Sequence, residues 1–337
     1  MPAEVSNPGD ICFLDNIRKN NGIDGLKNYI RDLFANNNEK AVELINDENL
    51  HYCSLYVLLP ELKSITRRGR LRAELSERNR TALRITKDIE SRDSEDIAVL
   101  TQSRDGDTLS ALKWILGTGY TDDGLSDGYE TVMEQTAILL SRTYRNTELL
   151  EQIEEMIFTR YRKGLFIHYL VWAFFEARST YSLSLLANRL LSADKNDIEL
   201  AKRLLSFIPP IAANNGADGM TLYMQALDWM QENQPFLYYT GESLHQTGAP
   251  HHYDISYEAR YLCRPVSPED GSYLRTADEN LRSRARSFNK LDKDSKKLLS
   301  DCSYLLYRRN IHQWNTWINL PVERQLKLAA DMMGGSV

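Results

Sequence analysis

Cysteine, glycine and proline are scarce in this sequence of 337 residues. The four cysteines, Cys12, Cys53, Cys263 and Cys302, are widely separated and form no C-x-x-C pair. This spacing argues against a structural zinc site and against a redox dithiol. The 17 glycines and 10 prolines are fewer than average composition gives, so we expect long elements joined by few hairpins.

Long hydrophobic runs are also missing. The longest strongly apolar stretch, residues 165–175, is about half of the ~20 residues that cross a bilayer, and it contains His168. The first ten residues carry an early acid and two prolines and have no apolar core, so they do not resemble a secretory signal. We therefore expect no membrane partner and a reducing, cytoplasmic location.

Apolar side chains instead recur with the 3.6-residue period of an α-helix along most of the chain. Leu26, Ile30 and Leu33, for example, fall on one helical face. Between residues 127 and 208 several such segments follow one another with short connections, which favours antiparallel neighbours. The pattern predicts an all-α fold, an irregular stack of antiparallel helical hairpins that resembles a degenerate α-solenoid or a helical bundle.

Composition divides the chain into four regions. Residues 1–92 are expected to form a helical region that ends in a basic amphipathic helix, and residues 93–234 a central helical stack. Residues 235–276 form a long loop region rich in Tyr, Pro and His, and residues 277–337 the C-terminal helices. Disordered segments seldom carry so many aromatic side chains, so we expect the loop region to be ordered.

The basic segment, residues 63–92, is the first candidate site in a chain whose net charge is −6. Its apolar seam has the alternating four- and three-residue spacing of a narrow helical stripe on one helix of about 20 residues. The seam positions are Leu71, Leu75, Arg78, Ala82, Ile85 and Ile89.

Three interpretations of this helix stay open. The seam packs on its own chain, or it docks on a partner protein or a second copy, with Arg78, Arg80, Arg84 and Lys87 contacting that partner. The third is nucleic-acid binding, because clustered basic side chains can follow a phosphate backbone. Against it, the segment has no aromatic side chain on which a base could stack.

Tyrosines of the loop region form the second candidate site. Tyrosine combines a large rigid face with one hydroxyl and is enriched at interfaces, so Tyr238, Tyr239, Tyr253 and Tyr257 are predicted to bind a partner. The alternative is that these rings fill grooves of the protein itself. The aromatic pairs near the C-terminus are interpreted as helix packing: Tyr304 with Tyr307, and Trp314 with Trp317.

Metal-binding patterns are incomplete. His251 and His252 are adjacent, so their side chains diverge in a helix or a strand, and no H-E-x-x-H motif occurs. Asp123, Asp127, Gly128 and Glu134 match part of a calcium-binding EF-hand loop, but Leu125 stands where an oxygen ligand is required. We expect no metal and interpret Asp127 with Glu130 as a helix cap.

Taken together, these patterns predict a non-catalytic helical adaptor or structural subunit of a protein assembly. No cofactor and no catalytic residue is expected. Two alternatives remain: a nucleic-acid-associated protein that uses residues 63–92, and an enzyme whose site gathers residues distant in sequence around His251 and His252.

Overall fold

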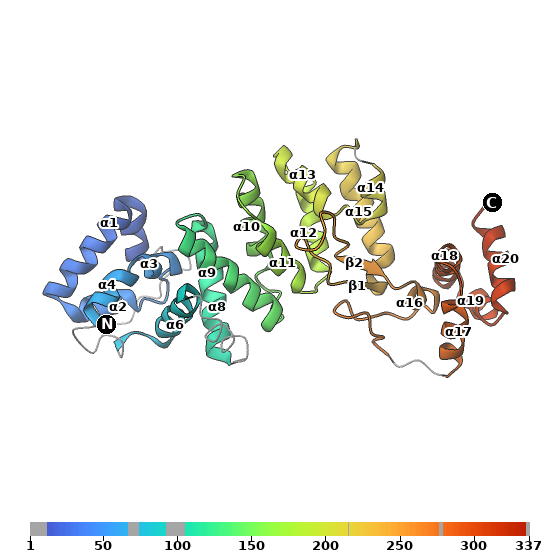
Figure 1. Cartoon of the computed structure of the whole chain (residues 1–337), viewed down its shortest axis with the longest axis horizontal. Helices are drawn as coiled ribbons and strands as arrows, with labels where there is room; N and C mark the ends of the chain where they lie inside the picture. The colour runs from blue at the N-terminus through green and yellow to red at the C-terminus, as the bar shows by residue number, and fades with distance from the viewer. Residues whose placement is uncertain (1–11, 67–73, 92–104, 215, 276–278, 335–337) are drawn as a thin grey trace, which may run out of the picture. The chain divides into compact units, whose positions relative to one another are not determined.

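A computed structural model of the chain (Figure 1) describes residues 12–66, 74–91, 105–214, 216–275 and 279–334. Within these ranges the chain is about 71% helical, and its only sheet has two short strands. The all-α prediction is therefore confirmed. Two compact units divide the chain, Met1–Ala177 and Arg178–Val337. Their boundary falls inside the central region that the sequence suggested for residues 93–234.

In the first unit, α6 packs against α8 and α9, α9 also packs against α11, and α1 packs against α2. The kink inside α1 falls at Gly22, whose φ of 75° favours glycine. The elements are α1 (Phe13–Asn36), α2 (Asn38–Ile45), α3 (Tyr52–Val57), α4 (Leu59–Thr66), α6 (Glu77–Ser91), α8 (Gly106–Gly119), the 3₁₀ turn η1 (Tyr120–Asp122), α9 (Asp127–Ile138), the π-turn η2 (Leu139–Thr143), α10 (Leu150–Arg162) and α11 (His168–Glu176).

In the second unit, α12 packs against α13 and α15, and α18 packs against α16, α19 and α20. The elements are α12 (Tyr181–Arg189), α13 (Lys195–Leu204), α14 (Pro209–Ala213), α15 (Gly219–Asn233), the 3₁₀ turn η3 (Gln234–Phe236), β1 (Leu237–Tyr239), β2 (Tyr253–Ile255), α16 (Tyr257–Tyr261), α17 (Glu279–Asn289), α18 (Lys293–Arg309), α19 (Ile311–Ile318) and α20 (Val322–Met332).

The aromatic loop region contains the only strands of the described chain. β1 and β2 pair antiparallel, with Leu237 opposite Ile255 and Tyr239 opposite Tyr253, and α16 follows directly. Each strand has three residues, which is too short for a visible alternation of polar and apolar side chains. For that reason the sequence showed only a segment without helical period.

The helix cap predicted at Asp127 lies one residue earlier. The side chain of Ser126 accepts a hydrogen bond from the backbone N–H of Tyr129, and Asp127 is the first residue of α9. Serine caps a helix as well as aspartate does, and here the residue before Asp127 takes that role. Asp127 and Glu130 still lie in the first turn, where negative charge favours the helix dipole.

Candidate partner-binding surface

The apolar seam of α6 faces its own unit. Leu75, Ala82, Ile85 and Ile89 are all buried, against α8 and α9 among others. Leu71 lies outside the described residues. The helix is also shorter than predicted, because α6 begins at Glu77 and a bend at Leu75 precedes it. Within the described chain, the first interpretation of the seam, packing on the chain itself, therefore accounts for its apolar residues.

Buried hydrogen bonds fix the rotation of α6 about its axis. The side-chain amide of Asn79 donates to the backbone carbonyl of Ile45 over 2.7 Å. About two turns further on, the hydroxyl of Thr86 lies 2.6 Å from that of Tyr52. Breaking either contact would leave a buried polar group unsatisfied, so α6 has one favoured orientation.

Arg78 strengthens this attachment. Its guanidinium donates to the backbone carbonyls of Asp47 and Glu48 over 2.8 and 2.7 Å, and it lies 4.3 Å from the ring centroid of Trp114. Burial lowers its pKa below the ordinary arginine value. Because the contacts of Arg78 are internal, we leave it out of the surface proposed for a partner.

Three of the predicted basic residues lie on the opposite face of the helix. We call Arg80, Arg84 and Lys87 the α6 outer row, since their spacing places them on one side. Arg80 is half-buried and donates to the carbonyl of Leu75 over 2.8 Å. Arg84 and Lys87 are exposed, and Arg84 also reaches the hydroxyl of Thr108 over 3.2 Å. The outer row therefore has two accessible cations, Arg84 and Lys87.

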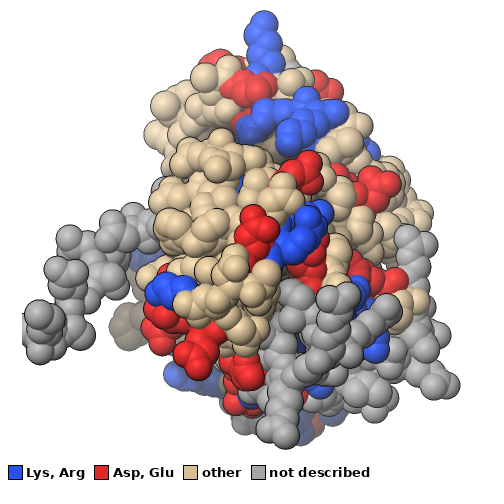
Figure 2. All heavy atoms as spheres, turned by 90° about the vertical axis from the view of Figure 1, so that its left-hand side faces the viewer, with Lys and Arg blue, Asp and Glu red and all other residues tan. Residues whose placement is uncertain are grey.

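The remaining basic residues of segment 63–92 are one described lysine and five arginines. Lys63 lies 3.9 Å from the carboxylate of Glu90, while Arg67, Arg68, Arg70, Arg72 and Arg92 lie outside the described residues. On the face drawn in Figure 2, lysines and arginines lie next to aspartates and glutamates. The described part of that face shows mixed charge and no continuous basic track.

The four predicted tyrosines differ in exposure. Tyr239 and Tyr253 are 6% and 1% exposed, and their rings lie 6.0 Å apart across the sheet, edge to face. Burial raises the pKa of Tyr253. These two rings fill the protein's own interior, so we also leave them out of the surface. Tyr238 and Tyr257 are half-buried and keep part of each ring accessible.

The histidines of the loop region do not converge. His251 is exposed, whereas His252 is 1% exposed and its Nδ1 lies 3.1 Å from the carbonyl of Glu242. Burial lowers the pKa of His252 to about 3, which keeps the ring neutral at pH 7. Among the described residues no three His, Cys, Asp or Glu side chains lie close enough to hold a metal ion.

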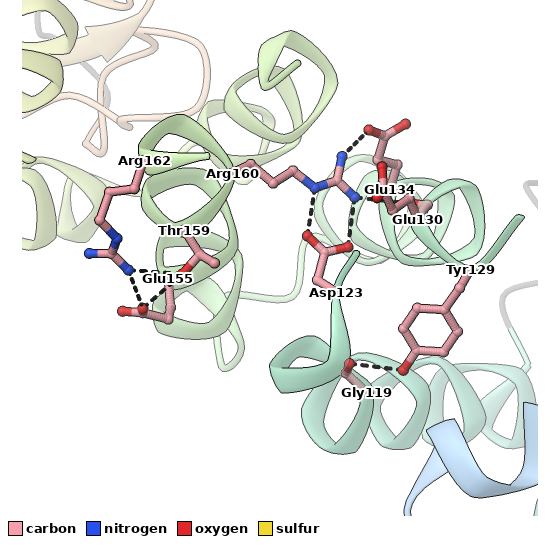
Figure 3. A network of polar contacts seen from close by, with 9 residues as sticks. All are labelled: Gly119, Asp123, Tyr129, Glu130, Glu134, Glu155, Thr159, Arg160 and Arg162. Atoms are coloured by element: carbon pink, nitrogen blue, oxygen red, sulfur yellow. Dashed lines mark hydrogen bonds and ion pairs between the residues drawn. The ribbon is translucent and has the colours of Figure 1, made fainter. Parts of the chain in front are cut away.

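Two carboxylates of the partial EF-hand pattern bind an arginine (Figure 3). Arg160 of α10 donates to both oxygens of Asp123 over 2.5 and 2.7 Å, and its remaining nitrogen contacts Glu134. The side chain of Arg160 is 2% exposed. A guanidinium thus occupies the place at which the pattern suggested calcium, and it joins α9, α10 and Asp123, the residue that follows η1.

All four thiols are poor nucleophiles. Burial raises the pKa of Cys12 and Cys302 to about 11 and that of Cys53 and Cys263 to about 12. A reactive cysteine needs the opposite shift, because the thiolate is the attacking form.

Comparisons with known proteins identify no relative. No protein-family model, curated protein or solved structure matches this chain. None of the helices in the described ranges has the length and hydrophobicity needed to cross a membrane.

Proposed function

We propose that the protein is a non-catalytic helical adaptor whose first unit binds an acidic surface of a partner protein through the α6 outer row. The observation that carries this proposal is that the two faces of α6 differ: the inner face is buried, and the outer face carries the exposed side chains of Arg84 and Lys87. The inner face of α6 is buried and hydrogen-bonded, so that the cations of its outer face project from a fixed helix. Sites on rigid elements hold their geometry better than sites on loops.

Geometry and charge define the partner. Arg84 and Lys87 are three residues apart, so their Cα atoms are separated by about 4.5 Å along the helix axis. A pair of carboxylates at helical spacing on the partner would match them. Exposed charges of this kind contribute more to association rate and choice of partner than to affinity, so binding should weaken with salt.

Two observations favour an adaptor over an enzyme. Burial raises the thiol pKa values and so keeps the thiols protonated, and His252, the buried histidine of the alternative catalytic cluster, is a weak base because burial lowers its pKa to about 3. A cytoplasmic location accords with four free cysteines, because an oxidising compartment favours disulfides.

The test compares two double charge reversals. Arg84→Glu/Lys87→Glu alters the outer row, while Arg80 is kept because its hydrogen bond supports the start of α6. Lys293→Glu/Lys297→Glu is the matched control, with the same charge change on an exposed face of α18. Tagged chains are expressed in the native source, and co-purifying proteins are quantified by mass spectrometry.

We expect proteins retained by the wild type and the control to be lost from the outer-row variant, with melting temperatures unchanged. The bound proteins should also dissociate as salt rises from about 50 to about 300 mM. Equal retention by the outer-row variant would refute the proposal. Titration of duplex DNA and RNA covers the second candidate: tight, salt-sensitive binding that this variant loses would replace the protein partner with a nucleic acid.

A further inference from the structure

A cavity in the second unit has the features of a ligand site. Its volume is about 560 Å³, within the range of pockets that hold small molecules. None of its lining residues belongs to the α6 outer row. The lining residues are Leu262, Cys263, Arg264, Pro265, Leu274, Arg275, Leu281, Tyr307 and Trp314.

One wall is formed by the end of α16. The N–H of Cys263 donates to the carbonyl of Arg260 over 3.2 Å, and the N–H of Arg264 donates to that of Ala259 over 2.8 Å. These two bonds form a Schellman motif, and Cys263 has the left-handed φ of 50° that this motif requires at its turning point. The chain reverses there, which places four consecutive residues, 262–265, along the cavity.

A second segment of the lining, Leu274 and Arg275, is attached to the first by a backbone hydrogen bond. The N–H of Leu274 donates to the carbonyl of Pro265 over 3.1 Å, so the two segments lie side by side. Leu274 itself is 63% exposed at the surface. Arg275 follows it directly and also lines the cavity.

A hydrogen bond and a ring contact orient the aromatic part of the lining. The indole N–H of Trp314 donates to the hydroxyl of Ser303 over 2.8 Å, and that hydroxyl donates to the carbonyl of Tyr261 over 2.5 Å. The ring of Tyr307 meets that of Trp314 edge to face, with centroids 5.2 Å apart. Two rings of fixed orientation thus offer an apolar surface beside the aliphatic side chains of the cavity.

The two arginines of the lining favour a ligand with negative charge. Arg264 and Arg275 both line the cavity, and no carboxylate is among those lining residues that the structure describes. Guanidinium groups form paired, charge-assisted hydrogen bonds to planar anions such as carboxylates. Aromatic and aliphatic surface would bind the remainder of such a ligand by excluding water.

We propose that this cavity binds a small amphipathic carboxylate, with the anionic group at Arg264 and Arg275 and the apolar body against Tyr307 and Trp314. The site is independent of the adaptor surface on α6, because it lies within the second unit and shares no residue with the first.

Isothermal titration calorimetry of the full chain with 2-naphthoate tests the site, and 2-naphthamide is the uncharged probe of nearly the same shape. We expect 2-naphthoate to bind at least about tenfold more tightly than the amide, a difference of about 1.4 kcal/mol. Arg264→Gln/Arg275→Gln should abolish that preference. The control Arg282→Gln/Arg286→Gln removes two exposed arginines of α17 that pair with Glu279, and it should preserve the preference.

Leu274→Glu provides a second variant that leaves the arginines in place. Because Leu274 is largely exposed, folding should be unaffected, and the new carboxylate should compete with 2-naphthoate for the two guanidinium groups. We expect its affinity to fall about tenfold or more with an unchanged circular dichroism spectrum. Absence of 2-naphthoate binding, equal affinity for the two probes, or full affinity in Arg264→Gln/Arg275→Gln would each overturn the proposal.

Discussion

Replacing Arg160 with methionine should destabilise the first unit strongly. The guanidinium is almost completely buried, and it binds both oxygens of Asp123, one oxygen of Glu134 and, over 3.4 Å, the carbonyl of Glu130. Methionine retains most of the aliphatic packing but leaves two partly or fully buried carboxylates without their cation. Removing one partner of a buried ion pair costs about 3–5 kcal/mol.

Guanidinium chloride denaturation of the full chain, followed by circular dichroism, measures this effect. With an m-value of roughly 5 kcal/mol/M, the midpoint should fall by roughly 0.6–1 M. Hydrogen exchange should locate the loss of protection in α9 and α10, which the network joins. Because the chain has two compact units, this local readout assigns the effect to the first one.

Arg162→Met is the matched control on the same helix. Arg162 binds Glu155 over 3.1 Å, but the two side chains are 30% and 41% exposed, and such pairs contribute about 0–1 kcal/mol. A triple variant with Arg160→Met, Asp123→Asn and Glu134→Gln should recover much of the stability, since no buried charge remains uncompensated. Equal effects of Arg160→Met and Arg162→Met would refute this reasoning.

Two smaller predictions concern single sites. Burial raises the pKa of Glu134 above its ordinary 4.5, although Arg160 opposes the shift. The folded state therefore favours the protonated carboxyl group, and the free energy of unfolding falls as pH rises through the raised pKa. The stability of Glu134→Gln relative to the wild type, from denaturation at several pH values, should therefore increase between about pH 4 and pH 7; a decrease would mean that the ion pair outweighs burial. At Cys263 the left-handed φ disfavours any side chain, so Cys263→Gly should be more stable than Cys263→Ala by about 1 kcal/mol. A melting temperature of Cys263→Ala equal to or above that of Cys263→Gly would contradict the backbone strain inferred at this position.

Many of the helices were predictable because their apolar spacing leaves a local signal, whereas the five-residue α16 lies in the predicted loop region. Ile85 and Ile89 of α6, for example, lie four residues apart and are both buried. Strands of three residues leave no such signal, and a cap can shift by one position when two capping residues are adjacent, as with Ser126 and Asp127. Local periodicity therefore predicted the fold class better than the ends of its elements.

Partners distant in sequence were not predictable. Arg78 falls in the predicted apolar seam, but its guanidinium lies over the ring of Trp114, which is 36 positions later in the chain. Asp123 and Glu134 had the spacing of calcium ligands, and only the fold brings Arg160 to them. In the cavity of the second unit, Arg264 and Trp314 come from separate segments, and the sequence suggested only helix packing for the aromatic residues.

The acid–base properties of the four thiols also determine how the protein can be labelled. A cysteine introduced at an exposed position such as Lys87 would have an ordinary pKa near 8.5, whereas the native thiols have pKa values of about 11 or 12. A more basic thiolate is intrinsically more reactive, but this gain is smaller than the loss in thiolate fraction, so the introduced group should react with maleimide faster than Cys12. Fluorophores or spin labels can thus be placed on α6 in the natural cysteine background, without replacing the native cysteines.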